Sequence, residues 1–199
     1  DMSEFINLIR LLQPGHDLPG RHFGIFSPGG GNTVNLSDLF SARPNITIPR
    51  LSPGSQKKLS KLLPEENVDV KNPVDIGAAA SHNLPAIFEI MAAEPGIETI
   101  LLFLGVDFYQ EFDNDDLCAD IVAAMADTML TIFKARKKSF CVLVQQQRQN
   151  NERMDRFKRV TLTILSEKGI PWINTPFKEA AVTLNKIVGY SSYLKKISA

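Results

Sequence analysis

The stretch "HFGIFSPGGGNTVNLSDLF", residues 22–40, decides the fold class. Its first part, 22–26, is mostly apolar and predicts a β-strand. Three consecutive glycines then predict a tight turn, and the spacing of Leu36, Leu39 and Phe40 predicts a helix over 33–43 with one buried face. A strand that turns directly into a helix begins a βαβ unit, so the stretch predicts an α/β fold.

The rest of the chain repeats this alternation. Continuous apolar runs at 98–104 and 139–144 have strand length and predict strands buried on both faces. Shorter strands are expected at 46–48 and 170–174, and the segment before Pro73 is expected to be extended. Helices are expected at 3–12, 52–63, 83–93, 115–136, 145–168 and 175–188. We therefore expect a three-layer, doubly wound α/β domain with a mostly parallel sheet at 21–199, preceded by a linker helix or arm at 1–20.

Composition excludes several classes of function. The 199 residues hold 22 basic and 22 acidic side chains, and this zero net charge favours neither nucleic acid nor an anionic membrane as a partner. No apolar run approaches the roughly 18 residues of a membrane span, and the start of the chain lacks a signal-peptide pattern. Cys118 and Cys141 lie in apolar segments and are expected to be buried free thiols of a cytoplasmic protein.

The glycine-rich turn has two interpretations. Ligands of doubly wound folds bind at the carboxyl ends of the strands, where the turn is expected to lie. The backbone N–H groups of Gly29, Gly30 and Gly31 would bind an anion at the helix N-terminus, and Asn32 or Thr33 would cap the helix or add a donor. The alternative is a turn that needs glycine only for its backbone angles. No complete nucleotide-binding motif is present, because position 34 is Val and a P-loop lysine is missing.

A second cluster, "KNPVDIGAA" at 71–79, follows the extended segment. Asn72 and Pro73 shape a turn, Asp75 supplies a carboxylate near a strand end, and Gly77 permits a close approach of the backbone. This cluster has a purely structural alternative as well, in which Asp75 caps the next element. The order of the strands puts both clusters at the same edge of the sheet.

The remaining residues of types that take part in catalysis or metal binding match no active-site or metal-site motif. His16, His22 and His82 are expected at surface or capping positions, and no serine lies in a hydrolase motif. The acidic segment 107–116 lacks the spacing of a calcium loop and is expected to be a solvated loop before a helix. We therefore expect no catalytic residue and no metal site within the chain.

Four motifs in order carry a family resemblance: "FGIFSPGGGNTVNLSDLF", "LSPGSQKKLSKLLP", "KNPVDI" and "EKGIPWINTPFKEAAVTLNKIV". Together they resemble the carboxyl-terminal, flavodoxin-like ligase domain of NDP-forming acyl-CoA synthetases, the relatives of succinyl-CoA synthetase. The resemblance covers roughly residues 20–190, and it places a family aspartate at Asp38.

The resemblance implies a reaction that passes phosphate through an acyl phosphate and a phosphohistidine. It implies that Gly29, Gly30, Gly31, Asn32 and Thr33 form half of a clamp for this phosphohistidine, with Asn72, Pro73, Asp75 and Gly77 as the supporting turn. The histidine, CoA, ADP or GDP, their triphosphates and Mg²⁺ would belong to the CoA-binding and nucleotide-grasp domains of the synthetase. This chain would bind no cofactor alone and would be inactive in isolation.

Two other interpretations stay open at this point. The chain would be a non-catalytic binding or assembly module if the same fold has lost the reaction. An FMN-binding flavodoxin is a third interpretation, but the glycine-rich turn lacks the Ser/Thr-rich pattern of an FMN phosphate loop.

Overall fold

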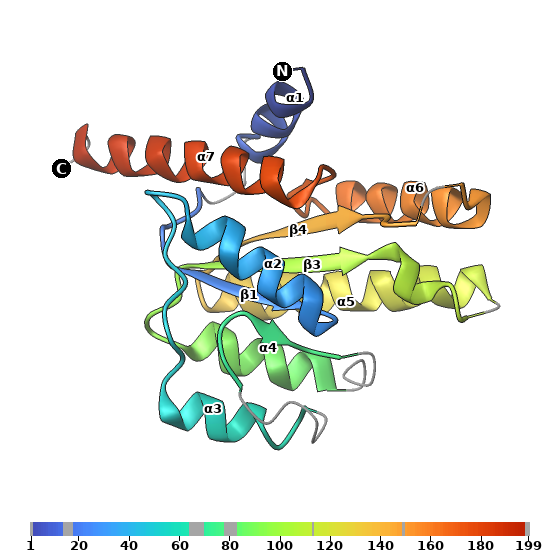
Figure 1. Cartoon of the computed structure of the whole chain (residues 1–199), viewed down its shortest axis with the longest axis horizontal. Helices are drawn as coiled ribbons and strands as arrows, with labels where there is room; N and C mark the ends of the chain where they lie inside the picture. The colour runs from blue at the N-terminus through green and yellow to red at the C-terminus, as the bar shows by residue number, and fades with distance from the viewer. Residues whose placement is uncertain are drawn as a thin grey trace.

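A five-stranded parallel sheet forms the centre of the molecule (Figure 1). The computed structural model describes residues 2–13, 18–63, 70–77, 83–112, 114–148 and 150–197. The strands are β1 (Phe23–Ser27), β2 (Val74–Asp75), β3 (Thr99–Gly105), β4 (Ser139–Gln145) and β5 (Trp172–Ile173), in the order β2-β1-β3-β4-β5. This is the strand order of flavodoxin-like folds, which confirms the predicted fold class.

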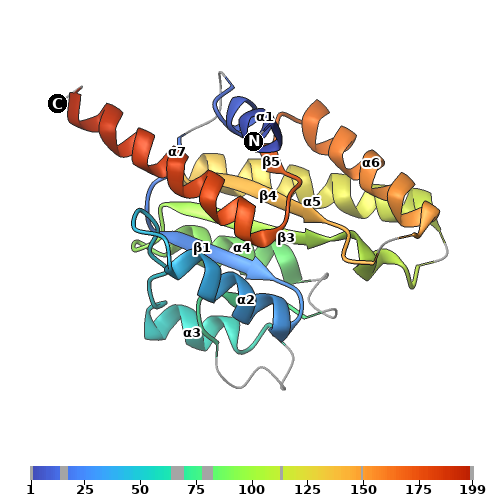
Figure 2. The same cartoon turned by 45° about the horizontal axis from the view of Figure 1, so that its top comes forward.

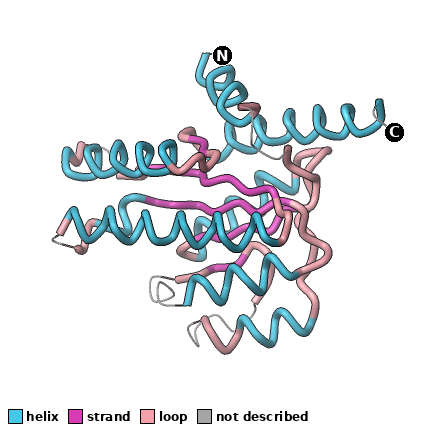
Figure 3. Tube along the Cα trace, turned by 180° about the vertical axis from the view of Figure 1, so that it is seen from behind, coloured by secondary structure: helices cyan, strands magenta, loops and turns pink. Residues whose placement is uncertain are grey.

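Helices cover both faces of the sheet (Figure 2). One face carries α1 (Met2–Leu11), α2 (Gly30–Ser41) and α7 (Phe177–Ile197), whose apolar side chains form one core cluster with the sheet. The other face carries α3 (Pro53–Leu59), α4 (Leu84–Ala93), α5 (Asp115–Ala135) and α6 (Glu152–Glu167), and Figure 3 shows this layer from behind. A short 3-10 helix, η2 (Val106–Tyr109), follows β3.

Alternate side chains of the central strands enter opposite clusters. Leu102 of β3 packs in the cluster of α3–α6, whereas Leu101 and Phe103 pack in the cluster of α1, α2 and α7. Because both faces are buried, every residue of β3 is buried, and the apolar run in the sequence is unbroken rather than alternating.

Several predicted elements differ from the observed ones. Segment 46–48 forms no strand, because Thr47 makes only a single parallel bridge with His22 before Pro49. Helix α2 begins at Gly30, so Gly30 and Gly31 belong to the helix and only Gly29 lies in the turn before it. The described residues before α6, 146–148, 150 and 151, are not helical, while α7 continues to Ile197.

The amino-terminal helix packs on the sheet domain. Leu11 is buried among residues of α2 and α7, and the Arg10 guanidinium carbon lies 3.5 Å from the centre of the Trp172 ring. The linker role of residues 1–20 stays a prediction. None of the described helices is long and apolar enough to cross a membrane.

Candidate functional site

The glycine-rich segment lies at the carboxyl edge of the sheet, directly after β1. Gly29 has a φ of 86° and is the N-cap residue of α2, where a side chain would be strained. From β1 the chain adds β2 on one side of the sheet, and then β3, β4 and β5 on the other side. Ligands of such folds bind at this switch point, beside the carboxyl ends of β1 and β3. A methyl group added at Gly29 would lie 3.7 Å from the Phe108 ring of η2, which borders this space.

The first turn of α2 leaves two backbone donors available. The N–H groups of Asn32 and Thr33 both bond to the Gly29 carbonyl at 3.1 Å. No described acceptor takes the N–H groups of Gly30 and Gly31, and both residues are exposed. These are the groups that a helix N-terminus offers to an anion, together with roughly half a positive charge from the helix dipole.

Asn32 and Thr33 do not cap the helix, contrary to one expectation. Both lie inside the first turn, so their side chains point back along the chain. The Asn32 amide nitrogen donates to the Pro28 carbonyl at 3.1 Å, and the Thr33 hydroxyl donates to the Gly29 carbonyl at 3.1 Å. The side chains therefore hold the turn and leave the Gly30 and Gly31 donors uncovered.

Asp75 joins the two predicted clusters. Its Oδ1 accepts the N–H groups of Gly29 and of Gly77, each at 2.9 Å. A methyl group on Gly30 would lie 3.6 Å from the other carboxylate oxygen. The glycine-rich segment is thus tied to the "NPVD" turn, and a negative charge lies beside the available donors.

Asn72 and Pro73 build the edge from which Asp75 projects. The Asn72 oxygen accepts the N–H of Ile25 at 2.9 Å, and its amide nitrogen donates to the carbonyls of Phe23 and Pro49 at 2.7 and 3.0 Å. The Asn72 side chain therefore bonds to the part of β1 that precedes its pairing with β2. A cavity of about 260 Å³ between α2 and this turn is lined by Thr33, Asn72, Pro73 and Asp75, among others.

Two further segments reach this edge, and the sequence patterns did not reveal them. The Asp107 carboxylate after β3 accepts the backbone N–H groups of Gln147 and Arg148, at 2.6 and 3.1 Å. The Gln147 amide nitrogen then donates to the Asn32 oxygen at 2.8 Å. The only available signal was that 107 and 147 each follow the end of an expected parallel strand.

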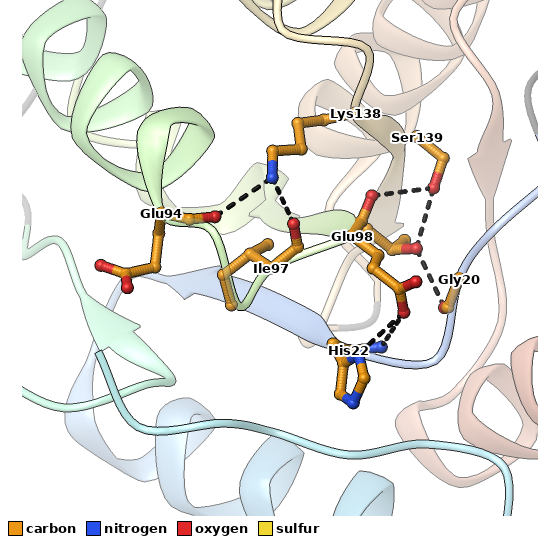
Figure 4. Close-up of polar contacts among 8 residues, drawn as sticks. Gly20, His22, Glu94, Ile97, Glu98, Lys138 and Ser139 are labelled. Atoms are coloured by element: carbon orange, nitrogen blue, oxygen red, sulfur yellow. Dashed lines mark hydrogen bonds and ion pairs between the residues drawn. The ribbon is translucent and has the colours of Figure 1, made fainter. Parts of the chain in front are cut away.

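The remaining candidates lie elsewhere. His22 Nδ1 is 2.9 Å from Glu98 Oε2 at the amino edge of the sheet, and Figure 4 shows this pair with Lys138 and Ser139. Burial opposes ionisation of Glu98, but the hydrogen bonds and charge of His22 outweigh it and lower the pKa of that carboxyl. His16 and His82 lie outside the described residues.

The described residues hold no recognisable catalytic constellation. Ser27 is fully buried, and its hydroxyl has no hydrogen-bond partner among the residues that the structure describes. No group of three or more His, Cys, Asp or Glu side chains within the described ranges is arranged to hold a metal ion. Cys118 and Cys141 are buried free thiols, as predicted.

Comparisons with solved structures support the fold. The protein PH0766 from Pyrococcus horikoshii OT3 superposes with a TM-score of 0.72 at 18% identity, over 96% of this chain and 40% of that one. The dinucleotide-forming acetyl-coenzyme A synthetase 1 of Ca. Korarchaeum cryptofilum superposes over 100% of this chain and 40% of its own, at 16% identity. Its TM-score is 0.67 as the apo form and 0.66 in complex with phosphate and ADP. No protein-family model and no curated protein matches the sequence.

Proposed function

We propose that this chain is the flavodoxin-like ligase domain of an NDP-forming acyl-CoA synthetase, in which the N-terminus of α2 stabilises a phosphohistidine carried by another domain. The observation that carries the proposal is the pair of uncovered N–H groups of Gly30 and Gly31 at the switch point of the sheet. The fold shared with an acetyl-coenzyme A synthetase supports it, as do the four ordered sequence motifs.

The chemistry of this helix end is electrostatic. A phosphoryl group carries close to two negative charges, and it gains from free backbone donors and from the positive end of the helix together. Gly29, Gly30 and Gly31 have no side chains, so a phosphate approaches the backbone directly. The side chains of Asn32 and Thr33 contribute by holding the turn, and Asp75 by fixing the N–H of Gly29.

The rest of the reaction would lie outside this chain. The phosphorylated histidine would come from a partner domain, since the described residues place no histidine at the carboxyl edge. CoA, the nucleoside diphosphate and Mg²⁺ would be bound by the CoA-binding and nucleotide-grasp domains. The chain spans about 40% of the length of the solved synthetase, which leaves room there for such domains.

The substitution Gly31→Asp tests the clamp in the protein that contains this chain with its partner domains. A side chain at Gly31 meets nothing within 4 Å, and an acidic residue in the first turn of a helix is favourable, so the fold is retained. The new carboxylate would repel the phosphoryl group, by about 3 kcal/mol for two unit charges about 5 Å apart at an effective dielectric constant of about 20. We expect the steady-state level of phosphohistidine, labelled from the nucleoside triphosphate, to fall at least tenfold.

Two control variants isolate the effect of charge at the site. Gly54→Asp makes the same change at the second residue of α3, also in open space, and is expected to leave the phosphohistidine level unchanged. Gly31→Ala adds a methyl group without charge and is expected to retain most of the wild-type phosphohistidine level. A wild-type level in Gly31→Asp would refute the clamp.

A non-catalytic assembly module is the second candidate, and the position of Asp75 favours it. A carboxylate beside the free donors weakens anion binding, which a domain without phosphate to hold would tolerate. Under this alternative the wild-type protein forms no phosphohistidine at all. The labelling experiment therefore separates the two candidates before any variant is made.

A further inference from the structure

A second cavity lies at the opposite, amino edge of the sheet. Its volume is about 860 Å³, and its lining comes from the segment before β1, the turn between α4 and β3, the end of α5 and the end of α7. Glu98, Lys138 and Ser139 are among its lining residues and appear in Figure 4. Sites for small molecules have volumes of about 300–1,000 Å³, so this cavity has room for one.

Three lysines of this cavity have no acidic partner within the described part of the chain. Lys134, Lys137 and Lys195 line it, and their ammonium groups make no ion pair or hydrogen bond with any described residue. Their neighbour Arg136, by contrast, pairs with Glu89 at 3.2 Å. The cavity thus gathers three uncompensated positive charges from two helices and a turn.

The other two charged side chains of the cavity, Lys138 and Glu98, make contacts within the protein. The Lys138 ammonium donates to the carbonyls of Glu94, at 3.1 Å, and of Ile97, and so holds the turn before β3. The Glu98 carboxylate accepts the backbone N–H of His22 at 3.1 Å and pairs with its ring. The charge of the Glu98 carboxylate is offset by that of Lys138, which lines the same cavity, so the positive charges of the other three lysines remain in excess.

Lys137 occupies a position that usually belongs to glycine. It has a φ of 53° directly after α5, and its N–H bonds to the Lys134 carbonyl at 3.0 Å while the N–H of Lys138 bonds to the Phe133 carbonyl at 2.9 Å. This is a Schellman motif, in which glycine is the common choice. A side chain there costs roughly 1–2 kcal/mol relative to glycine, so the chain keeps the Lys137 ammonium group at this cavity at a cost in stability.

We propose that this cavity binds a phosphate ester of mononucleotide size. The ammonium groups of Lys134, Lys137 and Lys195 bind the phosphate, and the apolar lining residues Leu18, Pro95 and Leu194 pack against the organic part. Inorganic phosphate alone would leave most of the volume unfilled. The site lies at the opposite edge of the sheet from the glycine-rich segment and does not depend on the proposed ligase role.

Titration of the ¹⁵N-labelled chain with adenosine 5′-monophosphate tests the proposal. We expect saturable shifts of the backbone amide signals of residues 134–139 and 194–195. Adenosine, which lacks the charge, is expected to bind at least tenfold more weakly. Failure of the monophosphate to bind, or shifts confined to residues 29–33, would overturn the proposal.

Lys137→Gly removes one ammonium group and relieves the backbone strain, so loss of folding does not confuse its result. We expect about tenfold weaker binding of the monophosphate, since one charged hydrogen bond is lost, together with an unchanged or higher melting temperature. Lys196→Ala is the matched control, because Lys196 is exposed in the same last turn of α7 as Lys195 but does not line the cavity. Wild-type binding by Lys137→Gly, or equal weakening by Lys196→Ala, would contradict the assignment.

Discussion

Replacing Asp75 by Asn is expected to change protein stability and anion binding in opposite directions. The Asp75 Oδ1 accepts two backbone N–H groups, from Gly29 and Gly77, both at 2.9 Å. Asn keeps the size of the side chain and one acceptor oxygen but removes the charge. The two bonds therefore persist in weaker form, and the negative charge beside Gly30 disappears.

The loss of stability follows from the difference between charged and neutral hydrogen bonds. A bond to a charged group contributes about 1.5–3 kcal/mol and a neutral one about 1 kcal/mol. Two such bonds in a half-buried place lead us to expect a decrease of about 1–3 kcal/mol in the free energy of unfolding. Urea denaturation followed by circular dichroism measures this decrease.

Anion binding at α2 is expected to become stronger in the same variant. Two unit charges about 5 Å apart repel by about 3 kcal/mol at an effective dielectric constant of about 20, and solvent screening reduces this at an exposed site. We therefore expect inorganic phosphate to bind up to about tenfold more tightly, measured from the amide signals of Gly30 and Gly31. Asp120→Asn removes the same charge from an exposed position on α5 and serves as the control.

Either of two results would refute this reasoning. Unchanged stability would mean that the Asp75 carboxylate does not hold the glycine-rich segment. Weaker phosphate binding would mean that the carboxylate arranges the donors more than it repels the anion.

Three further outcomes are expected from the packing. Gly24→Ala should destabilise the fold by about 1–3 kcal/mol in urea denaturation, because the new methyl group would lie 2.8 Å from the methyl carbon of Met91 and 3.1 Å from Cγ2 of Ile97, and both side chains are fully buried. An unchanged midpoint would contradict the tight packing there. Burial raises the pKa of the Cys141 thiol from 9.0 to about 12. The unfolded chain therefore loses this proton at a lower pH than the folded chain does, and the free energy of unfolding should fall as the pH rises from about 9 to 12. Unfolding curves of Cys141→Ala should show a smaller fall over that range, and an identical fall would exclude this thiol as the cause. Arg10→Ala should lower the free energy of unfolding by about 0.5–2 kcal/mol and change the fluorescence of Trp172, the single tryptophan, because the ring loses the guanidinium 3.5 Å above it; an unchanged spectrum would mean that the two groups are apart in solution.

The main elements were predictable because their signals are local. The apolar run at 98–104 indicated a strand covered on both faces, which is observed at Thr99–Gly105, and Ser52 followed by Pro53 indicated the start of α3. The boundaries were less predictable where context overrides a residue's preference. Glycines disfavour helices, yet α2 begins at Gly30, because the bond from Gly29 to Asp75 fixes the chain in front of it.

The candidate site was predictable only as a set of residues at one edge. The order of βαβ units placed the glycine-rich segment and the "NPVD" turn together, and the Asp75 bond confirms that they meet. Their role in binding phosphate stays a prediction. The approach of Gln147 to Asn32 was not foreseeable, because a polar segment carries no local pattern that specifies its partner.

The sequence by itself determined the layers of this protein, since hydrophobic periodicity reports which faces of each element avoid water. The tertiary structure alone decided which polar groups meet. Asp75 lies against Gly29, Asp107 holds the segment after β4, and Lys195 joins Lys134 and Lys137 at one cavity. Each of these contacts joins residues far apart in the chain, and the packing of the helices on the sheet, rather than any local preference, sets the distance between them.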